Sequence, residues 1–232
     1  MVGKLVSGLA SHGFSEKRLG ELSGLIVEEL RKWLEEERNS KAEALFRSEV
    51  DAGRIQFRLR ADGRNWKMPF TAETFEPEGA DQLNGKDGGT LTKSLFSPIY
   101  KGDFSSQDER DIAVYLDGER ALKWWHRNVA RSHYSLQGWR REKVYPDFIF
   151  AMSHGETDNR VVVLEMKGKH LAGNDDTEYK KAVLRLMSEA FVEDHVSHVG
   201  ELDLVVENGM RMECDLVLIP EWKTRLPELM RR

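Results

Sequence analysis

Cysteine is nearly missing from this chain, in which Cys214 is the only one among 232 residues. A single thiol cannot form an internal disulfide or by itself build a cysteine-rich zinc site, and its scarcity fits a reducing compartment. Long apolar runs are missing as well. No stretch approaches the roughly 20 residues that a membrane-spanning helix needs, and the N-terminal segment lacks the long apolar part of a secretory signal. We therefore expect a cytoplasmic protein without membrane association.

A surplus of positive charge is missing too. The formal net charge is -5, so the charge of the whole chain does not indicate nucleic-acid binding. The sequence contains no repeat and no low-complexity tract, and 40% of its residues are hydrophobic. This composition argues against disorder and allows one large domain, or one domain with a helical appendage.

Positive charge is nevertheless concentrated in residues 120–143, which we call the basic segment. It holds seven lysines and arginines, one acidic residue and three of the six tryptophans. Cations that follow phosphates, beside aromatic rings on which bases stack, are typical of a nucleic-acid surface. An amphipathic helix with its tryptophans in the core and its basic side chains in solvent would give the same pattern. The candidate DNA contacts, for which a solvated surface position is the alternative, are Arg127, Arg131, Arg140 and Arg141 here and Lys169 and Lys180 further on.

The N-terminal third is predicted to be mainly helical. Apolar residues recur at steps of three and four from Ser15 to about Arg38, and a shorter helical pattern covers residues 40–50. Alternation between residues 51 and 69 predicts two short strands around an Asp62-Gly63 turn, and the glycine-rich and aspartate-rich residues 76–93 predict a loop. We expect residues 1–75 to be a connecting or packing element and residues 94–232 to be the main domain.

The C-terminal part alternates between predicted helices and strands. Ser106 and Glu109 form a capping-box signature at the start of one helix, and a second helix is expected to carry Trp124 and Trp125. Strands are predicted at residues 134–138, 145–152, 160–167, 201–206 and 210–219, and a helix at residues 177–191. The dipeptide Asn208-Gly209 predicts a type I′ hairpin turn between the last two strands. This arrangement predicts an α/β protein.

Charged residues stand at the ends of two of these strands. Asp147 lies near the start of one, and Glu165 and Lys167 lie near the end of the next, where the alternation of a strand turns both to one face. With the backbone carbonyl of Met166, the two carboxylates offer an all-oxygen site suited to Mg²⁺. Lys167 beside the metal could orient and help deprotonate a water, or neutralise charge on a phosphate. The alternative is a structural ion pair at the edge of the sheet.

Pro146-Asp147 followed by Glu165-Met166-Lys167 resembles the signature of the PD-(D/E)xK nuclease superfamily. The flanking stretches "KAEALFRSEVDAGRI", "SLFSPIYKGDFSSQDERDIAVYLD" and "KWWHRN" resemble the C-terminal endonuclease region of the restriction subunit of type III restriction enzymes. The resemblance implies a restriction-endonuclease-like fold, with a mixed central sheet flanked by helices, that cuts DNA with Mg²⁺, for which Mn²⁺ can substitute. It implies that Asp147 and Glu165 bind the metal and that Lys167 is catalytic. Glu109 then matches a helix-borne acidic residue near the metals, although it could simply complete the helix cap.

The same resemblance implies two partners besides DNA: a helicase-like ATPase region of the same parent protein and a methyltransferase subunit that selects the target. This chain has no G-x-x-x-x-G-K-[ST] phosphate loop, so it is expected to be a fragment of a longer protein or a stand-alone relative. Two alternatives stay open. One is a repair or recombination nuclease of the same fold, and the other is a catalytically inactive module for DNA binding or subunit docking.

Overall fold

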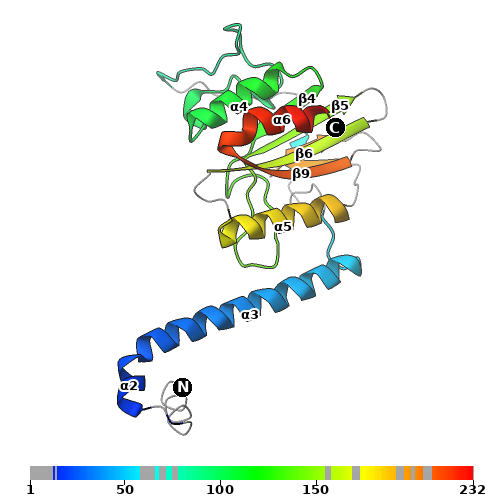
Figure 1. The fold of residues 1–232 in the computed structure, drawn as a ribbon. Coiled ribbons are helices and arrows are strands. Elements are labelled where there is room, and N and C mark those ends of the chain that lie inside the picture. Colours follow the sequence, from blue (N-terminus) through cyan, green and yellow to red (C-terminus); the bar gives the residue numbers. More distant parts are fainter. Residues whose placement is uncertain are drawn as a thin grey trace. The chain divides into compact units, whose positions relative to one another are not determined.

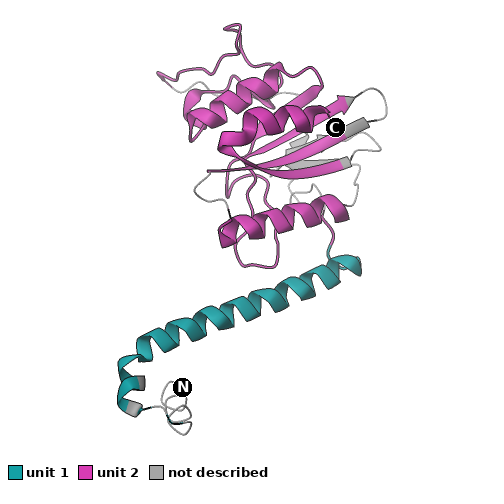
Figure 2. Ribbon diagram, in the orientation of Figure 1, with its two compact units in different colours: residues 1–55 teal, residues 56–232 magenta. Residues whose placement is uncertain are grey.

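The structure is a computed structural model that describes residues 13, 15–57, 66–67, 72–74, 78–154, 158–168, 173–191, 196–199, 202–205 and 211–231. The chain divides into two compact units, Met1–Ile55 and Gln56–Arg232 (Figure 2). Within the described residues, no helix is both long and apolar enough to cross a membrane.

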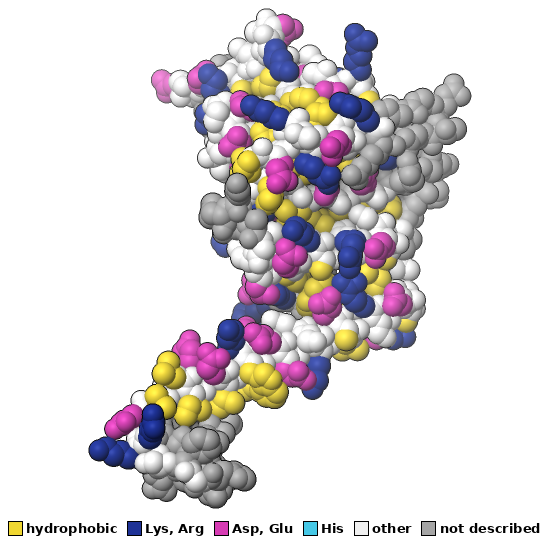
Figure 3. Space-filling view, in the orientation of Figure 1, with side chains coloured by type: hydrophobic (Ala, Val, Ile, Leu, Met, Phe, Trp, Pro, Cys, Tyr) yellow, Lys and Arg dark blue, Asp and Glu magenta, His cyan; other side chains and the backbone are white. Residues whose placement is uncertain are grey.

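The first unit consists of helices α2 (Glu16–Glu21) and α3 (Ser23–Asp51). The sequence predicts two helices that meet near Ser40. In the structure the break lies near Leu22 instead, and α3 continues through Ser40. No glycine or proline occurs in residues 25–52, so nothing interrupts the helix. The large apolar side chains that α3 exposes to solvent are Leu25, Leu30, Trp33, Leu34 and Leu45. Figure 3 shows hydrophobic side chains, in yellow, gathered on the surface of this unit.

The second unit is built on a four-stranded sheet in the order β4-β5-β6-β9. The strands are β4 (Leu122–Arg127), β5 (Phe148–His154), β6 (Asp158–Lys167) and β9 (Arg211–Leu218). β5 is antiparallel to both β4 and β6, and β9 is parallel to β6, so the sheet is mixed. Helices α4 (Gln107–Gly118) and α6 (Trp222–Arg231) cover one face and α5 (Asp175–Ala190) covers the other (Figure 1). The predicted mixed α/β sheet flanked by helices is therefore confirmed at this level of description.

Short elements complete the unit. Strands β1 (Trp66–Lys67), β7 (Val196–Val199) and β8 (Leu202–Val205) form a small sheet, and β2 (Ala72–Glu73) pairs with β3 (Phe96–Ser97). Single turns of 3-10 helix lie at Lys101–Asp103 (η1) and Ile219–Glu221 (η3). The predicted Asp62-Gly63 turn lies outside the described residues. The two described strands that follow it, β1 and β2, pair with β8 and β3 and not with each other.

The helix predicted for Trp124 and Trp125 is wrong, because residues 122–127 form strand β4. Trp125 is fully buried in the core between the sheet and α4, and Trp125 also pairs with Phe150 of β5. Apolar residues at positions 122, 124 and 125 fit either structure locally. Pairing with β5 decides between them, as tertiary context often overrides a local pattern.

The hairpin predicted between the last two strands is also wrong. β9 lies parallel to β6, and α5 connects the two, whereas β8 pairs with β7. The Asn208-Gly209 dipeptide itself lies outside the described residues. The weak strand predicted at residues 134–138 is a loop with a single bridge between Leu136 and Val144, and helix α6 was not predicted.

Asp117 connects the end of α4 to the outer edge of the sheet. Its carboxylate accepts hydrogen bonds from the backbone N–H of Thr92 at 3.0 Å and of Lys93 at 2.8 Å. It also accepts one from the indole Nε1 of Trp125 at 2.9 Å. Residues 93–95 in turn bond to Trp125 through its backbone, so one carboxylate fixes a loop, a helix end and a core strand.

We expect Asp117→Ala to lower the free energy of unfolding by about 2 kcal/mol, because three donors lose a charged acceptor at once. Urea unfolding followed by circular dichroism measures this loss. The matched control is Asp111→Ala on the exposed side of the same helix, which should change stability by less than about 0.5 kcal/mol. Equal effects of the two substitutions would contradict the role given to Asp117.

Candidate active site

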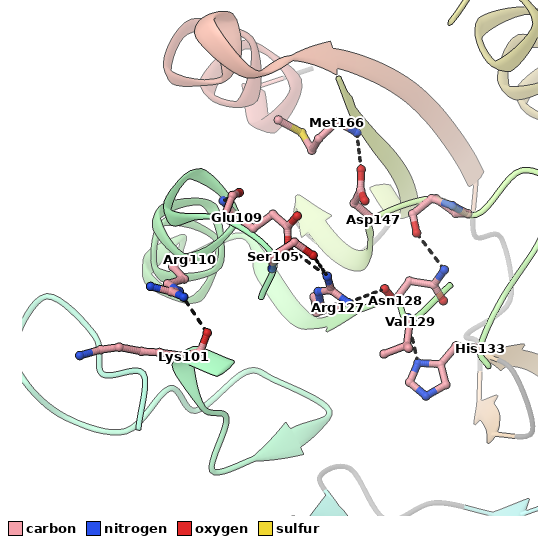
Figure 4. A network of polar contacts seen from close by, with 12 residues as sticks. Lys101, Ser105, Glu109, Arg110, Arg127, Asn128, Val129, His133, Asp147 and Met166 are labelled. Carbon is pink, nitrogen blue, oxygen red and sulfur yellow. Dashed lines mark hydrogen bonds and ion pairs between the residues drawn. The ribbon is translucent and has the colours of Figure 1, made fainter. Parts of the chain in front are cut away.

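The two predicted carboxylates come together at one end of the sheet. In the pairing of β5 with β6, Phe148 lies opposite Leu164, and the same register continued by one residue puts Asp147 opposite Glu165. The backbone N–H of Asp147 donates to the carbonyl of Leu164 at 2.9 Å. Oδ2 of Asp147 accepts from the backbone N–H of Met166 at 2.6 Å (Figure 4). The predicted hairpin and the juxtaposition of Asp147 with Glu165 are thus both present.

Glu165 is a buried carboxylate with two different oxygens. The residue is only 2% exposed. Its Oε1 accepts from Nζ of Lys180 at 2.8 Å and lies 3.3 Å from Nζ of Lys167. Its Oε2 is buried and has no hydrogen-bond partner within the described part of the chain. A buried carboxylate oxygen without a partner is costly, and an ion or a water is the usual explanation.

Burial raises the pKa of Asp147 to about 7, and the negative charge of Glu165 adds to this shift. Glu109 raises the pKa further, while the N–H of Met166 and the charge of Arg127 act in the opposite direction. Two carboxylates that share one site repel each other, which favours keeping a proton on one of them. The Asp147 carboxyl therefore holds its proton up to about neutral pH unless another cation takes the place of that proton.

Glu109 lies in the first turn of α4, where its backbone N–H takes part in the helix cap and its carboxylate bonds to neighbouring groups. Ser106 caps α4 by accepting from the backbone N–H of Glu109 at 3.2 Å. The Glu109 carboxylate accepts from the N–H of Ser105 at 3.1 Å and from Arg127 at 3.0 Å. It is also close enough to act on the pKa of Asp147. The carboxylate thus borders the Asp147 site while it is held by an ion pair with Arg127.

Asn128 is a residue that the sequence did not single out. Its buried amide donates to the carbonyls of Tyr134 at 2.9 Å and Pro146 at 2.8 Å, and accepts from the N–H of Tyr134 at 2.9 Å. Its backbone N–H also donates to the carbonyl of Asp147 at 2.8 Å. The side chain therefore fixes the loop that leads into the site. An asparagine after a strand carries no distinctive sequence signal for this role.

The structure assigns three of the six candidate DNA contacts to other interactions. Arg140 pairs with Asp175 at 2.7 Å, and its guanidinium lies 4.5 Å from the centre of the Tyr179 ring. Arg127 is bonded to Glu109, and the ammonium of Lys180 is bonded to Glu165. Arg131 and Arg141 are exposed. Lys169 lies outside the described residues.

The histidines of the basic segment add no charge to it at neutral pH. Nε2 of His126, which is buried on β4, lies 3.1 Å from Nδ1 of His133. Burial lowers the pKa of His126 to about 3, with further contributions from His133 and Arg127. Burial also lowers the pKa of His133. Both rings are therefore neutral at pH 7.

The donors present fit a hard divalent cation. Within the described residues, no group of three or more His, Cys, Asp or Glu side chains is arranged to hold a metal. The predicted ligands are instead two carboxylates and one carbonyl. The N–H of Met166 points to Asp147, and in an extended strand the C=O of the same residue faces the same edge. Together with the unpartnered Oε2 of Glu165, this gives the oxygen-only donor set that Mg²⁺ prefers.

Comparison with known proteins adds no identity to this geometry, since no family model, no curated protein and no solved structure matches the chain.

The raised pKa of Asp147 makes stability depend on pH. The folded chain binds this proton more tightly than the unfolded chain, whose aspartate pKa is about 3.9. The resulting stabilisation is complete below about pH 4 and is lost as the pH rises to about 7. In EDTA, we expect the melting temperature of Asp147→Asn to rise relative to that of the wild type as the pH increases from 5 to 8. The reason is that only the wild type loses stability when Asp147 loses its proton. Asp111→Asn, at an exposed position, is the control, and a difference that stays constant with pH would contradict the shift.

Proposed function

We propose that this chain contains a Mg²⁺-dependent DNA endonuclease domain of the restriction-endonuclease-like fold. Its nearest counterpart would be the nuclease part of a type III restriction subunit. The observation that carries the proposal is the register of β5 and β6, which puts Asp147 opposite Glu165 with Lys167 3.3 Å from that carboxylate. These are the residues of the PD-(D/E)xK signature, and they meet on a mixed sheet flanked by helices.

The proposed metal ligands are Asp147, Oε2 of Glu165 and the carbonyl of Met166. Mg²⁺ bound there would supply positive charge that stabilises the phosphate oxygens and lowers the pKa of a bound water. Asp147 would accept the metal in place of its proton, because the metal relieves the repulsion from Glu165 that raises its pKa. Metal binding would then be coupled to proton release around neutral pH.

Lys167 is proposed to act on the attacking water or on the phosphate. Its side chain is 15% exposed, and its ammonium lies 3.3 Å from Glu165 and 3.6 Å from Asp176. An ammonium at this position can orient the water or neutralise the charge that develops as water adds to phosphorus and the P–O bond breaks. Glu109 and Arg127 would border the same site and balance each other's charge.

A non-catalytic module is the second candidate, and the ion pairs of Glu165 favour it. Two lysines already neutralise that carboxylate, as expected for a structural pair that needs no metal. Such a module would bind its partner through the basic segment, which includes Trp124 and Arg127. Arg127 is bonded to Glu109, so its guanidinium has little freedom to recruit a partner, whereas Trp124 is half-buried on β4.

Calorimetric titration of Mn²⁺ separates the two candidates. We expect the wild type to bind Mn²⁺, with affinity rising from pH 6 to pH 8 as Asp147 loses its proton, and Asp147→Ala to lose this binding. The titrations should be repeated with a DNA duplex in Ca²⁺-free buffer. Phosphate oxygens of the DNA can complete the coordination of the metal, so binding can depend on the substrate. Absence of binding at millimolar Mn²⁺, with and without DNA, would favour the non-catalytic module.

Cleavage tests the role of Lys167. We expect Lys167→Ala to reduce the rate of DNA cleavage by about 100-fold with the fold intact by circular dichroism. Lys181→Ala, on the exposed side of α5, should cut at the wild-type rate. Duplex, flap and junction substrates should be compared in parallel, because preference for a branched substrate would indicate a repair or recombination nuclease. The proposed methyltransferase and ATPase partners should be added if the chain alone is silent.

A further inference from the structure

Lys180 is a charged residue on the buried side of a helix. Thr177, Val183, Leu184 and Met187, which lie three, three, four and seven positions from it along α5, are all almost completely buried. This spacing defines the face that a helix turns to the core. A lysine on such a face needs a partner for its ammonium, because an unpaired buried charge is costly.

The partner of Lys180 is the carboxylate of the candidate metal site. Its Nζ lies 2.8 Å from Oε1 of Glu165, and its side chain is only 17% exposed. Asp176, one turn earlier on α5, lies 3.8 Å away and is more than half exposed. The short contact to the buried carboxylate is therefore the main interaction, and a charge-assisted hydrogen bond of this length is among the stronger kinds.

Lys167 interacts with the same oxygen but is held less tightly. Its Nζ is 3.3 Å from Oε1 of Glu165 and 3.6 Å from Asp176, so it is shared between two carboxylates at longer distances. Because Lys180 already neutralises Glu165, Lys167 can leave that carboxylate without stranding a buried charge. The two lysines thus differ in what the geometry allows them to do.

We propose that Lys180 is a positioning residue that acts through Glu165. By holding Oε1, it fixes the rotation of the carboxylate so that the unpartnered Oε2 is directed to the metal, and it frees Lys167 for the water or the phosphate. This inference rests on the proposed metal-dependent function. Residues that hold a metal ligand from behind commonly change metal affinity by about 10-fold to 100-fold when they are removed.

Lys180 is not a DNA contact in this assignment. Its ammonium faces the interior side of the site, and phosphate binding would require breaking the 2.8 Å contact and leaving Glu165 with Lys167 alone. Lys181, the next residue, provides the comparison, since it pairs on the surface with Glu178 at 3.0 Å and is about half exposed.

The test is a double-mutant cycle on Mn²⁺ affinity, measured by calorimetry on the full chain. We expect Lys180→Met, whose unbranched apolar side chain suits a buried helix face, to weaken Mn²⁺ binding about 10-fold. In the background of Glu165→Gln, the same substitution should cause no further loss, because Lys180 acts only through that carboxylate. Lys180→Arg should recover most of the affinity, and Lys181→Met should leave it unchanged.

Thermal unfolding of each variant shows whether a loss of binding is a loss of fold. Unchanged Mn²⁺ binding by a folded Lys180→Met would overturn the inference, because Lys180 would then have no effect on the metal site. Tighter binding would overturn it too, because the ammonium would then act only by repelling the metal. An equal loss in both backgrounds would overturn it as well, because Lys180 would act independently of Glu165. Failure of the wild type to bind Mn²⁺ with or without DNA is a separate outcome that removes the proposed function and this inference together.

Discussion

The antiparallel register of β5 and β6 is the constraint on which the rest of the candidate site depends. It is held by residues that are almost completely buried on both strands, including Phe148, Phe150, Val162 and Leu164. Because strand side chains alternate, a slip of one residue would exchange the face of Glu165 with the face of Met166. Met166 now packs in the core beneath α4 and α6, so a slip would put a carboxylate into that core. Hydrophobic packing thus specifies where the polar groups stand.

Among the described residues, two of the three carboxylates at the site are paired with a cationic side chain, and Asp147 is not. Glu109 is bonded to Arg127 on one side, and Glu165 is bonded to Lys180 on the other, while Asp147 lies between them with a backbone N–H as its main donor. Burial and the negative charge of Glu165 raise the pKa of Asp147, and they outweigh the opposing effect of Arg127. The protein supplies a partner for each outer carboxylate and leaves the central one to a proton or a cation.

Local patterns in the sequence predicted the features that depend on neighbours in the chain. The Ser106 cap of α4, the hairpin of β5 with β6 and helix α5 are set by residues a few positions apart. The sequence failed where pairing is between distant segments. The local pattern of residues 122–127 predicts a helix, but pairing with β5 makes them strand β4, and β9 pairs with β6 and not with the strand before it. Asp147, Glu165 and Lys167 could be found from their spacing. Lys180 is predicted as a DNA contact, and only its place among the apolar positions of α5 indicates that it faces Glu165 instead.

The parallel pairing of β9 with β6 also has a consequence for how the chain acquires its fold. Strands β5 and β6 are joined by a short connection and can pair early, but β9 must wait for the whole of α5 and the segment after it. During that interval one edge of β6 is open, and it carries the run Val161, Val162, Val163 and Leu164, which has high β propensity and no charge. The strand that carries Glu165 and Lys167 is therefore prone to pair with another chain before folding is complete. A chain truncated before Arg211 would keep that edge open permanently and be inclined to aggregate.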